Sequence, residues 1–191
     1  MTRAEGCMHF IGRSGRGNSR GRILQTSTIE RDERIRFVMI ETGKPFPDFA
    51  LPNQDGKLVR LGDFRGKWLV VYVYPKDDTP GCTIQGKSFT ATKSDFEDAG
   101  ISVVGVSQDD VGSHKSFCDK FGFTIDLLAD TRAELLQAVG VGEAEWQGTK
   151  YWERTSFVID PNGVLRRVYE KVNPQGHETT LLEDIKQMQG G

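Results

Sequence analysis

The stretch Trp68-Leu-Val-Val-Tyr-Val-Tyr-Pro-Lys-Asp-Asp-Thr-Pro-Gly-Cys-Thr83 joins an apolar run, a loop and the start of a helix. The run Trp68–Tyr74 is short and apolar on both faces, as a central strand covered by helices must be. Proline and glycine mark the loop that follows, and the residues after Cys82 have a helical pattern over 83–98. This succession of a strand, a loop and a helix is typical of an α/β protein.

The rest of the chain after Met39 repeats this alternation. Further strands are expected at Ile101–Val106 and Phe157–Ile159, and helices at Ser113–Phe121, Arg132–Val139 (capped by Asp130) and His177–Met188. The turn Asp160-Pro-Asn-Gly163 predicts an antiparallel hairpin with Val164–Tyr169, and Asn53–Gly56 predicts a smaller hairpin near the domain start. We therefore expect an α/β fold with a central mixed β-sheet flanked by helices.

Composition indicates one soluble domain, which we place at residues 39–191. The 191 residues are 37% hydrophobic and 27% charged, with no apolar run near the ~20 residues that span a bilayer and no signal-peptide core. Residues 1–38 form an Arg/Gly/Ser-rich extension that we expect to be disordered. This extension is either a segment outside the native product, a targeting segment or a basic arm. We expect a cytoplasmic protein, and the targeting alternative leaves an organelle open.

Charge and cysteine content narrow the function. Residues 1–38 hold eight Arg against four acidic residues, a net charge of +4. Because the whole chain has a net charge of −2, residues 39–191 carry −6. An acidic domain argues against nucleic acid as its partner. The three cysteines are Cys7, Cys82 and Cys118, with no C-x-x-C pair, so neither a disulfide scaffold nor a zinc site is expected. No motif for a cofactor or metal is present, and Cys7, in the extension, is given no catalytic role.

Cys82 is the candidate nucleophile. At the first turn of a helix, free backbone N–H groups and the positive end of the helix dipole favour an anion, and the thiolate is the form of cysteine that attacks a peroxide. Thr79 can turn its hydroxyl toward the sulfur or toward the incoming oxygen. The alternative is that Cys82 is a small buried hydrophobic residue. The acids Asp77 and Asp78 of the same loop are expected to point to solvent.

The pattern Pro75-x-x-x-Thr79-x-x-Cys82 resembles that of the peroxiredoxins. Tyr72-Val-Tyr-Pro-Lys and Thr79-Pro-Gly-Cys-Thr83 are similar in particular to the bacterioferritin-comigratory, or peroxiredoxin Q, branch. The likeness runs from Pro47–Gly56 through Arg154–Gly163 to the terminal helix. It implies a thioredoxin-like fold, reduction of hydrogen peroxide and organic hydroperoxides with Cys82 as the peroxidatic residue, and a monomer.

Arg154 is the candidate cation of the site. The attacking thiolate and the expelled oxygen are both anionic, and a guanidinium keeps its charge when buried and can hold both. Arg154 opens an apolar strand, whereas the other arginines of the domain lie in polar or turn contexts. A surface ion pair is the alternative role. The resemblance favours the first, because Arg154 matches the active-site arginine of the family.

A second thiol is needed to recycle a sulfenic acid internally. Many members of the branch carry it five residues after the first, but this chain has Lys87 there. Cys118, 36 residues after Cys82, resembles the placement used by another subgroup. It would form an intramolecular disulfide after local unwinding, reopened by thioredoxin or a similar dithiol. The alternative for Cys118 is a structural thiol. His114 lies one helical turn before Cys118, and we expect it to be a solvated side chain rather than a metal ligand.

Three other functions compete with this one. A redox-sensing or chaperone-like binding protein would use Cys82 only as a switch, and a one-Cys peroxidase would rely on an external thiol. A disulfide reductase is disfavoured because Thr79 stands where a C-x-x-C motif has its first sulfur. Multiple turnover of peroxide distinguishes an enzyme from a sensor.

Overall fold

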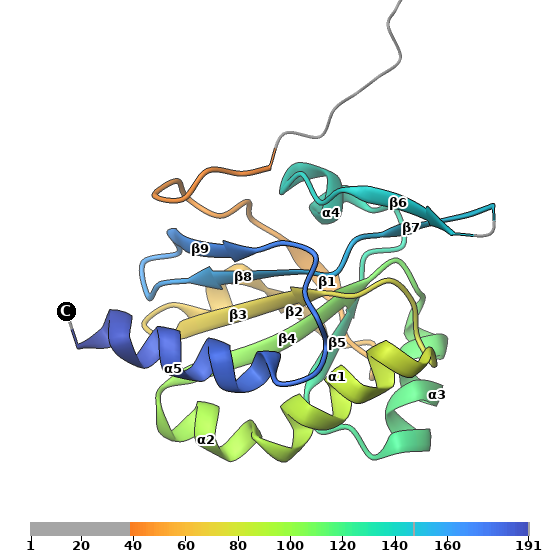
Figure 1. The fold of residues 1–191 in the computed structure, drawn as a ribbon, viewed down its shortest axis with the longest axis horizontal. Coiled ribbons are helices and arrows are strands. Elements are labelled where there is room, and N and C mark those ends of the chain that lie inside the picture. The colour runs from red at the N-terminus through yellow and green to blue at the C-terminus, as the bar shows by residue number, and fades with distance from the viewer. Residues whose placement is uncertain (1–38, 147, 191) are drawn as a thin grey trace, which may run out of the picture. The chain divides into compact units, whose positions relative to one another are not determined.

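The computed structural model describes residues 39–146 and 148–190. A five-stranded sheet in the order β5-β4-β3-β8-β9 lies at its centre (Figure 1). In that order the strands span Asp126–Ala129, Ile101–Ser107, Trp68–Val73, Thr155–Ile159 and Leu165–Tyr169. β4 is parallel to β3 and β5, whereas β8 is antiparallel to β3 and β9. The expected mixed sheet and its C-terminal hairpin are confirmed, while residues 1–38, with Cys7, lie outside the described part.

Each face of the sheet packs against its own layer. Tyr72 and Val70 of β3 lie in the hydrophobic cluster formed with α1 (Pro80–Ala91), α2 (Lys93–Asp98), α3 (Val111–Phe121) and α5 (His177–Gln189). The alternate residues of β3 face a cluster that includes α4 (Glu134–Ala138), η1 (Leu61–Phe64) and the hairpin of β1 (Ala50–Pro52) and β2 (Leu58–Arg60). Figure 1 shows α1, α2 and α5 on one side and α4 on the other. Successive residues of β3 thus alternate between the two clusters, as expected of a strand buried on both faces.

The predicted helix over 83–98 is two helices with an earlier start. α1 begins at Pro80, because proline at the first helical position needs no N–H partner and already has a helical φ. It ends at Ala91, where the Thr92 hydroxyl donates to the carbonyl of Ser88 at 2.9 Å. Such back-bonding bends helices, and α2 starts at Lys93.

Two further helices differ from expectation at their first turns. α3 starts two residues early because the Asp110 carboxylate accepts the Ser113 N–H at 2.8 Å and caps it. α4 is short because buried Asp130 accepts the N–H groups of Glu134 and Leu136 at 2.9 and 3.0 Å. The capping role predicted for Asp130 is thus confirmed, although Ala133 occupies the N-cap position.

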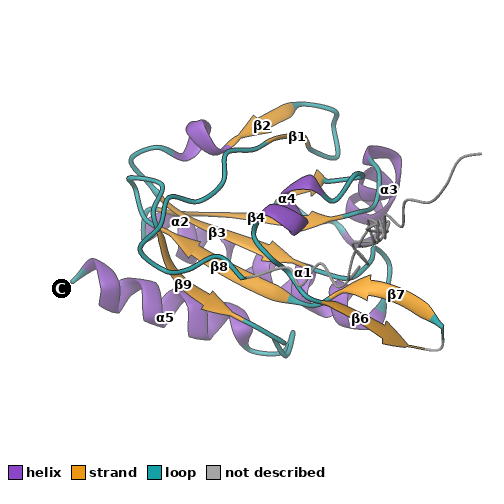
Figure 2. Cartoon of the chain, turned by 90° about the horizontal axis from the view of Figure 1, so that it is seen from above, coloured by secondary structure: helices purple, strands orange, loops and turns teal. Residues whose placement is uncertain are grey.

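Three strands were not anticipated from the sequence. β5 joins the edge of the central sheet, while β6 (Glu143–Trp146) and β7 (Thr149–Trp152) form an antiparallel hairpin outside it. Figure 2 shows this hairpin projecting beyond the end of the central sheet. Its charged and polar residues lack the apolar run of a core strand. No helix within residues 39–146 and 148–190 is long and apolar enough to cross a membrane.

Candidate active site

Cys82 is the third residue of α1, at the end of the loop that leaves β3. The first helical backbone hydrogen bond of α1 runs from the Thr83 N–H to the Thr79 carbonyl, four residues earlier, at 2.9 Å. The N–H groups of Gly81 and Cys82 precede that bond, so they belong to the free donors of the helix N-terminus. These donors and the helix dipole stabilise negative charge on the sulfur or on a bound oxygen. The side chain itself is buried, with 3% exposed.

The structure brings Arg154 to the sulfur of Cys82. Its Nη2 donates to Sγ at 3.3 Å, across 72 residues of sequence. Arg154 immediately precedes β8, and its carbonyl accepts the N–H of Val172 at 3.0 Å, which fixes the backbone. Gly81 permits the approach, because a Cβ there would stand 3.2 Å from Nη2. The predicted thiol–guanidinium pair is therefore present in the described structure.

Gln85 is a site residue that the sequence reasoning missed. Its Oε1 accepts the Arg154 Nη1 at 2.5 Å, so the two arms of the guanidinium bind Gln85 and Cys82 separately. Gln85 is 1% exposed, and its Nε2 has no hydrogen-bond partner among the described residues. Its position three residues after Cys82, on the same helix face, was the available signal. Gln85 orients Arg154 and leaves a buried donor beside it.

Thr79 and Pro75 lie in the loop as predicted, but neither contacts the sulfur by a hydrogen bond in the described structure. Thr79 is the N-cap of α1, and its hydroxyl donates to the carbonyl of Lys76 at 3.1 Å. That bond leaves the hydroxyl oxygen free to accept. Pro75 borders a cavity of about 250 Å³, together with Tyr151 and Trp152 of β7.

Asp77 was expected to point to solvent, and this expectation is wrong. The side chain is buried and accepts from the Tyr74 hydroxyl at 2.8 Å, the Ser113 hydroxyl at 2.7 Å and the His114 Nδ1 at 2.8 Å. Burial raises the pKa of Asp77, but the hydrogen bonds, led by that of His114, hold the pKa below its ordinary value. Asp77 is therefore an ionised carboxylate within a polar network.

His114 was expected to be solvated, and it is fully buried. The reason is its partner, since the Asp77 carboxylate comes from a loop 37 residues away and supplies the hydrogen bond that burial requires. Asp78 does face solvent as predicted, and it pairs with Lys120 of α3 at 2.6 Å. Lys87, at the vacant position for a second cysteine, lies over the Phe121 ring of α3. These contacts tie α3 to the loop and helix that carry Cys82.

Cys118 lies on α3, buried and not joined to Cys82 by a disulfide. Burial, followed by the charges of Asp77 and Asp119, raises the pKa of Cys118 to about 12. At neutral pH only about one Cys118 in 10⁵ is a thiolate, too few for attack on a peroxide. Both sulfurs belong to the cluster on the α1 side of the sheet. Cys82 is thus the better candidate for the first step.

Tyr72 is close enough to both sulfurs to interact with their charges. Burial raises the pKa of Tyr72 well above its ordinary value, and the charges of Cys118 and then Cys82 raise it further, while Arg154 lowers it. The phenol is 2% exposed and stacks on Phe89 of α1. A neutral hydroxyl therefore belongs to the shared surroundings of the two thiols.

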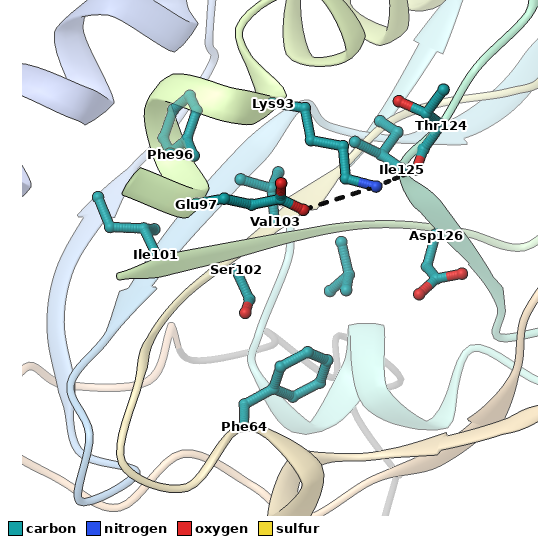
Figure 3. A pocket seen from close by; sticks show the side chains of 11 residues that line it. Phe64, Lys93, Phe96, Glu97, Ile101, Ser102, Val103, Thr124, Ile125 and Asp126 are labelled. Carbon is teal, nitrogen blue, oxygen red and sulfur yellow. Dashed lines mark hydrogen bonds and ion pairs between the residues drawn. The ribbon is translucent and has the colours of Figure 1, made fainter. Parts of the chain in front are cut away.

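A pocket of about 160 Å³ lies elsewhere, between residues of η1, α2, β4 and β5 (Figure 3). Lys93 reaches across it, donating to the Thr124 carbonyl at 2.8 Å and pairing with Glu97 at 3.7 Å. Neither cysteine lines this pocket. It is separate from the candidate active site.

Comparison with known proteins identifies the family. The AhpC/TSA family profile matches residues 42–168. A putative peroxiredoxin Bcp of Coxiella burnetii is 40% identical over 146 residues, which are 75% of this chain and 97% of that protein. A chloroplastic peroxiredoxin Q of Populus jackii is 39% identical over 153 residues, covering 80% of this chain and 71% of that protein.

Solved structures give the same result. A cysteine-to-serine variant of Xylella fastidiosa PrxQ superposes with a TM-score of 0.75 at 32% identity, covering 79% of this chain and 98% of its own. The bacterioferritin comigratory protein of Xanthomonas campestris, studied for alkyl peroxide reduction, has a TM-score of 0.71 at 34% identity, covering 78% and 99%. The thioredoxin-like fold implied by the sequence is confirmed. This chain belongs to the AhpC/TSA family as a peroxidase of the Bcp/peroxiredoxin Q branch.

Proposed function

We propose that this protein reduces hydrogen peroxide and organic hydroperoxides through a sulfenic acid on Cys82. The contact at 3.3 Å between the Arg154 Nη2 and the Cys82 Sγ carries the proposal. The thiolate attacks one peroxide oxygen, the S–O bond forms as the O–O bond breaks, and water or an alcohol leaves after protonation. Arg154 and the free N–H groups of α1 stabilise the charge on the sulfur and on the leaving oxygen.

Thr79 and Pro75 complete the proposed site. The Thr79 hydroxyl oxygen, free to accept while its proton is held by the Lys76 carbonyl, lies at the N-cap where a hydroperoxide proton would be bound. Pro75 shapes the loop beside the cavity of about 250 Å³. Cys82, Thr79 and Arg154 do not line that cavity, so the proposal of organic hydroperoxides as substrates does not rest on it. The alkyl peroxide reduction studied in the Xanthomonas campestris protein supports this substrate class.

Cys118 is the proposed resolving residue. It attacks the Cys82 sulfenic acid to form an intramolecular disulfide, which thioredoxin or a similar dithiol reduces. The two cysteines replaced by serine in solved Xanthomonas campestris peroxiredoxin Q variants are 36 residues apart, the same separation as Cys82 and Cys118. Both thiols also belong to one buried cluster here. The Cys82 loop, the Cys118 helix, or both must unwind locally before the disulfide forms.

One experiment tests this sequence of steps. One equivalent of hydrogen peroxide should convert the reduced protein to a faster-migrating species on a non-reducing gel. Cys118→Ser should lose that species and thioredoxin-linked turnover together. If Cys118→Ser keeps full turnover with thioredoxin, Cys118 is not the resolving residue and an external thiol serves a one-Cys peroxidase. If the wild type consumes one equivalent and stops with reductant present, the sensor function is supported instead.

The remaining proposals concern the chain as a whole. We propose that residues 39–191 are a self-sufficient thioredoxin-like domain, monomeric and cytoplasmic. The family match over 42–168 and the coverage of 97% of the Coxiella burnetii relative by 146 residues support the domain assignment. Several plant relatives are named chloroplastic, so the location is tested by imaging the full chain against a chain that starts at Met39. Sedimentation of the reduced protein tests the monomer.

A further inference from the structure

A buried histidine with one unused nitrogen lies on the helix that carries Cys118. His114 is 0% exposed, and its Nδ1 bonds the Asp77 carboxylate at 2.8 Å. Its Nε2 has no hydrogen-bond partner among the described residues. Leaving a polar atom without a partner in the interior costs free energy, so such an atom needs an explanation.

The partner of Nδ1 fixes the form of the imidazole. Asp77 accepts from the Tyr74 and Ser113 hydroxyls and its pKa is lowered, so it is ionised, and an ionised carboxylate can only accept hydrogen bonds. The Nδ1 atom must therefore carry the proton that it shares with Asp77. In the neutral ring this leaves the lone pair on Nε2, so the unpartnered nitrogen is a proton acceptor. A carboxylate that orients an imidazole in this way also stabilises the imidazolium that forms when Nε2 takes a proton.

Cys118 is the group that needs such an acceptor. It follows His114 by four residues on α3, so the two side chains share a face of the helix. The Cα–Cβ bond of a helical residue tilts toward the N-terminus, which directs the Cys118 thiol back toward the turn of His114. Its pKa of about 12 leaves almost no thiolate at neutral pH, although attack on a sulfenic acid requires one.

We propose that His114 is the general base that removes the thiol proton of Cys118 as this sulfur attacks oxidised Cys82, with Asp77 as its positioning residue. The inference rests on the proposed resolving role of Cys118. The Cys118 S–H and Cys82 S–O bonds break, and one S–S bond and one water form. The thiol proton passes to Nε2 and from there to the departing hydroxide. The Cys118 sulfur is oxidised and the Cys82 sulfur is reduced, so no further oxidant is consumed.

The same carboxylate connects this base to the loop of the first sulfur. Asp77 precedes Cys82 by five residues, and its own N–H donates to the Asp109 carboxylate at 2.9 Å. In the reduced structure no hydrogen bond joins Nε2 to the Cys118 thiol. The contact therefore forms when Cys118 moves to reach Cys82, a movement that disulfide formation itself requires. The base acts in the second step, after the peroxide has been reduced and water or an alcohol has left.

Single-turnover kinetics of the full chain separate the two steps. The reduced protein is mixed with one equivalent of hydrogen peroxide between pH 6 and pH 9, quenched at intervals and analysed by mass spectrometry for sulfenic acid and disulfide. His114→Asn keeps an N–H for Asp77 and removes the base. It should form sulfenic acid at the wild-type rate but form disulfide at least about 100-fold more slowly, the usual minimum for loss of a general base. Ser116→Ala, at an exposed position of α3, is the matched control.

The pH profile of disulfide formation distinguishes a base from a structural residue. The titratable groups packed around the imidazole are Tyr74, which follows β3, Asp77 of the loop, and Cys118 on the next turn of α3. In His114→Asn the rate should rise about tenfold per pH unit, because attack then depends on free Cys118 thiolate. Asp77→Asn should show the same steep profile, and the wild type a shallower one.

Each outcome decides the inference. Disulfide formation at the wild-type rate in His114→Asn overturns it. So does a wild-type rate that itself rises tenfold per pH unit from pH 6 to pH 9, a measurement that does not depend on whether a variant folds. If the wild type forms sulfenic acid but no intramolecular disulfide, the proposed role of Cys118 fails and the inference fails with it. A disulfide in the wild type with an unaffected His114→Asn variant refutes the inference alone.

Discussion

Replacing Arg154 by glutamine should slow the reaction of Cys82 with hydrogen peroxide by about 30- to 150-fold. A full charge 3.3 Å from a thiolate interacts by about 5 kcal/mol at an effective dielectric constant of 20. Water and the N-terminus of α1 replace part of that, and hydrogen bonds with a charged partner contribute about 1.5–3 kcal/mol net. We take about 2–3 kcal/mol as the loss, and each ~1.4 kcal/mol is a factor of ten in rate.

The assay is the loss of peroxide in a single turnover, with the reduced protein in slight excess and the reaction quenched at intervals. Arg132→Gln is the matched control, because it makes the same charge change at an exposed side chain paired only with Glu134 among the described residues. Arg154→Lys keeps the charge but loses the planar fork of the guanidinium, so its rate should lie between the rates of Arg154→Gln and wild type. A rate for Arg154→Gln within threefold of wild type, in a folded variant, would refute the electrostatic role of Arg154.

Three other changes have defined outcomes. Gln85→Leu frees one arm of the Arg154 guanidinium and should lower the single-turnover rate about tenfold, the equivalent of one hydrogen bond with a charged group. Gly105→Ala places a Cβ 2.7 Å from the Tyr72 ring and should lower the free energy of unfolding in urea by about 1–3 kcal/mol. Burial, and then Arg154, lower the pKa of His177 to about 4, below its unfolded value near 6.5. The unfolded chain therefore binds more protons, so stability should fall by up to about 3 kcal/mol from pH 7 to pH 4.

Controls keep these outcomes interpretable. Gly62→Ala, where an added Cβ meets nothing within 4 Å, should leave the free energy of unfolding in urea unchanged or raise it by up to about 1 kcal/mol. His177→Gln should flatten the pH dependence between pH 4 and pH 6.5, and an equally steep dependence in that variant would assign it to another group. A Gln85→Leu rate equal to wild type would mean that Arg154 holds its position without Gln85. Wild-type stability in Gly105→Ala would show that β3 and β5 yield more easily than close packing allows.

Four of the five strands of the central sheet, all but β5, were predictable because local sequence marks them. The continuous apolar run at Trp68–Tyr74 and the turn at Asp160–Gly163 each report structure within a few residues. The hairpin of β6 and β7 was not predicted because its strands have no continuous apolar run and pair with each other outside the central sheet. The break at Thr92 depends on one side-chain hydrogen bond, which helical periodicity does not reveal.

The active site followed the same division. The contact between Cys82 and Arg154 could be anticipated because one lies at a helix start and the other at the start of an apolar strand, while their catalytic roles stay a prediction. Asp77 and His114 were misplaced because each resembles a surface residue when taken alone. Their burial depends on the hydrogen bond between them across 37 residues, a non-local property. Gln85 was overlooked although helical spacing from Cys82 places it on the same face.

The most direct test is steady-state consumption of hydrogen peroxide by wild type and Cys82→Ser with NADPH, thioredoxin reductase and thioredoxin in excess. We predict many turnovers per molecule for the wild type and none above background for Cys82→Ser, with both proteins unfolding at similar urea concentrations. Peroxide consumption by Cys82→Ser at the wild-type rate would contradict the assignment of Cys82 as the attacking sulfur.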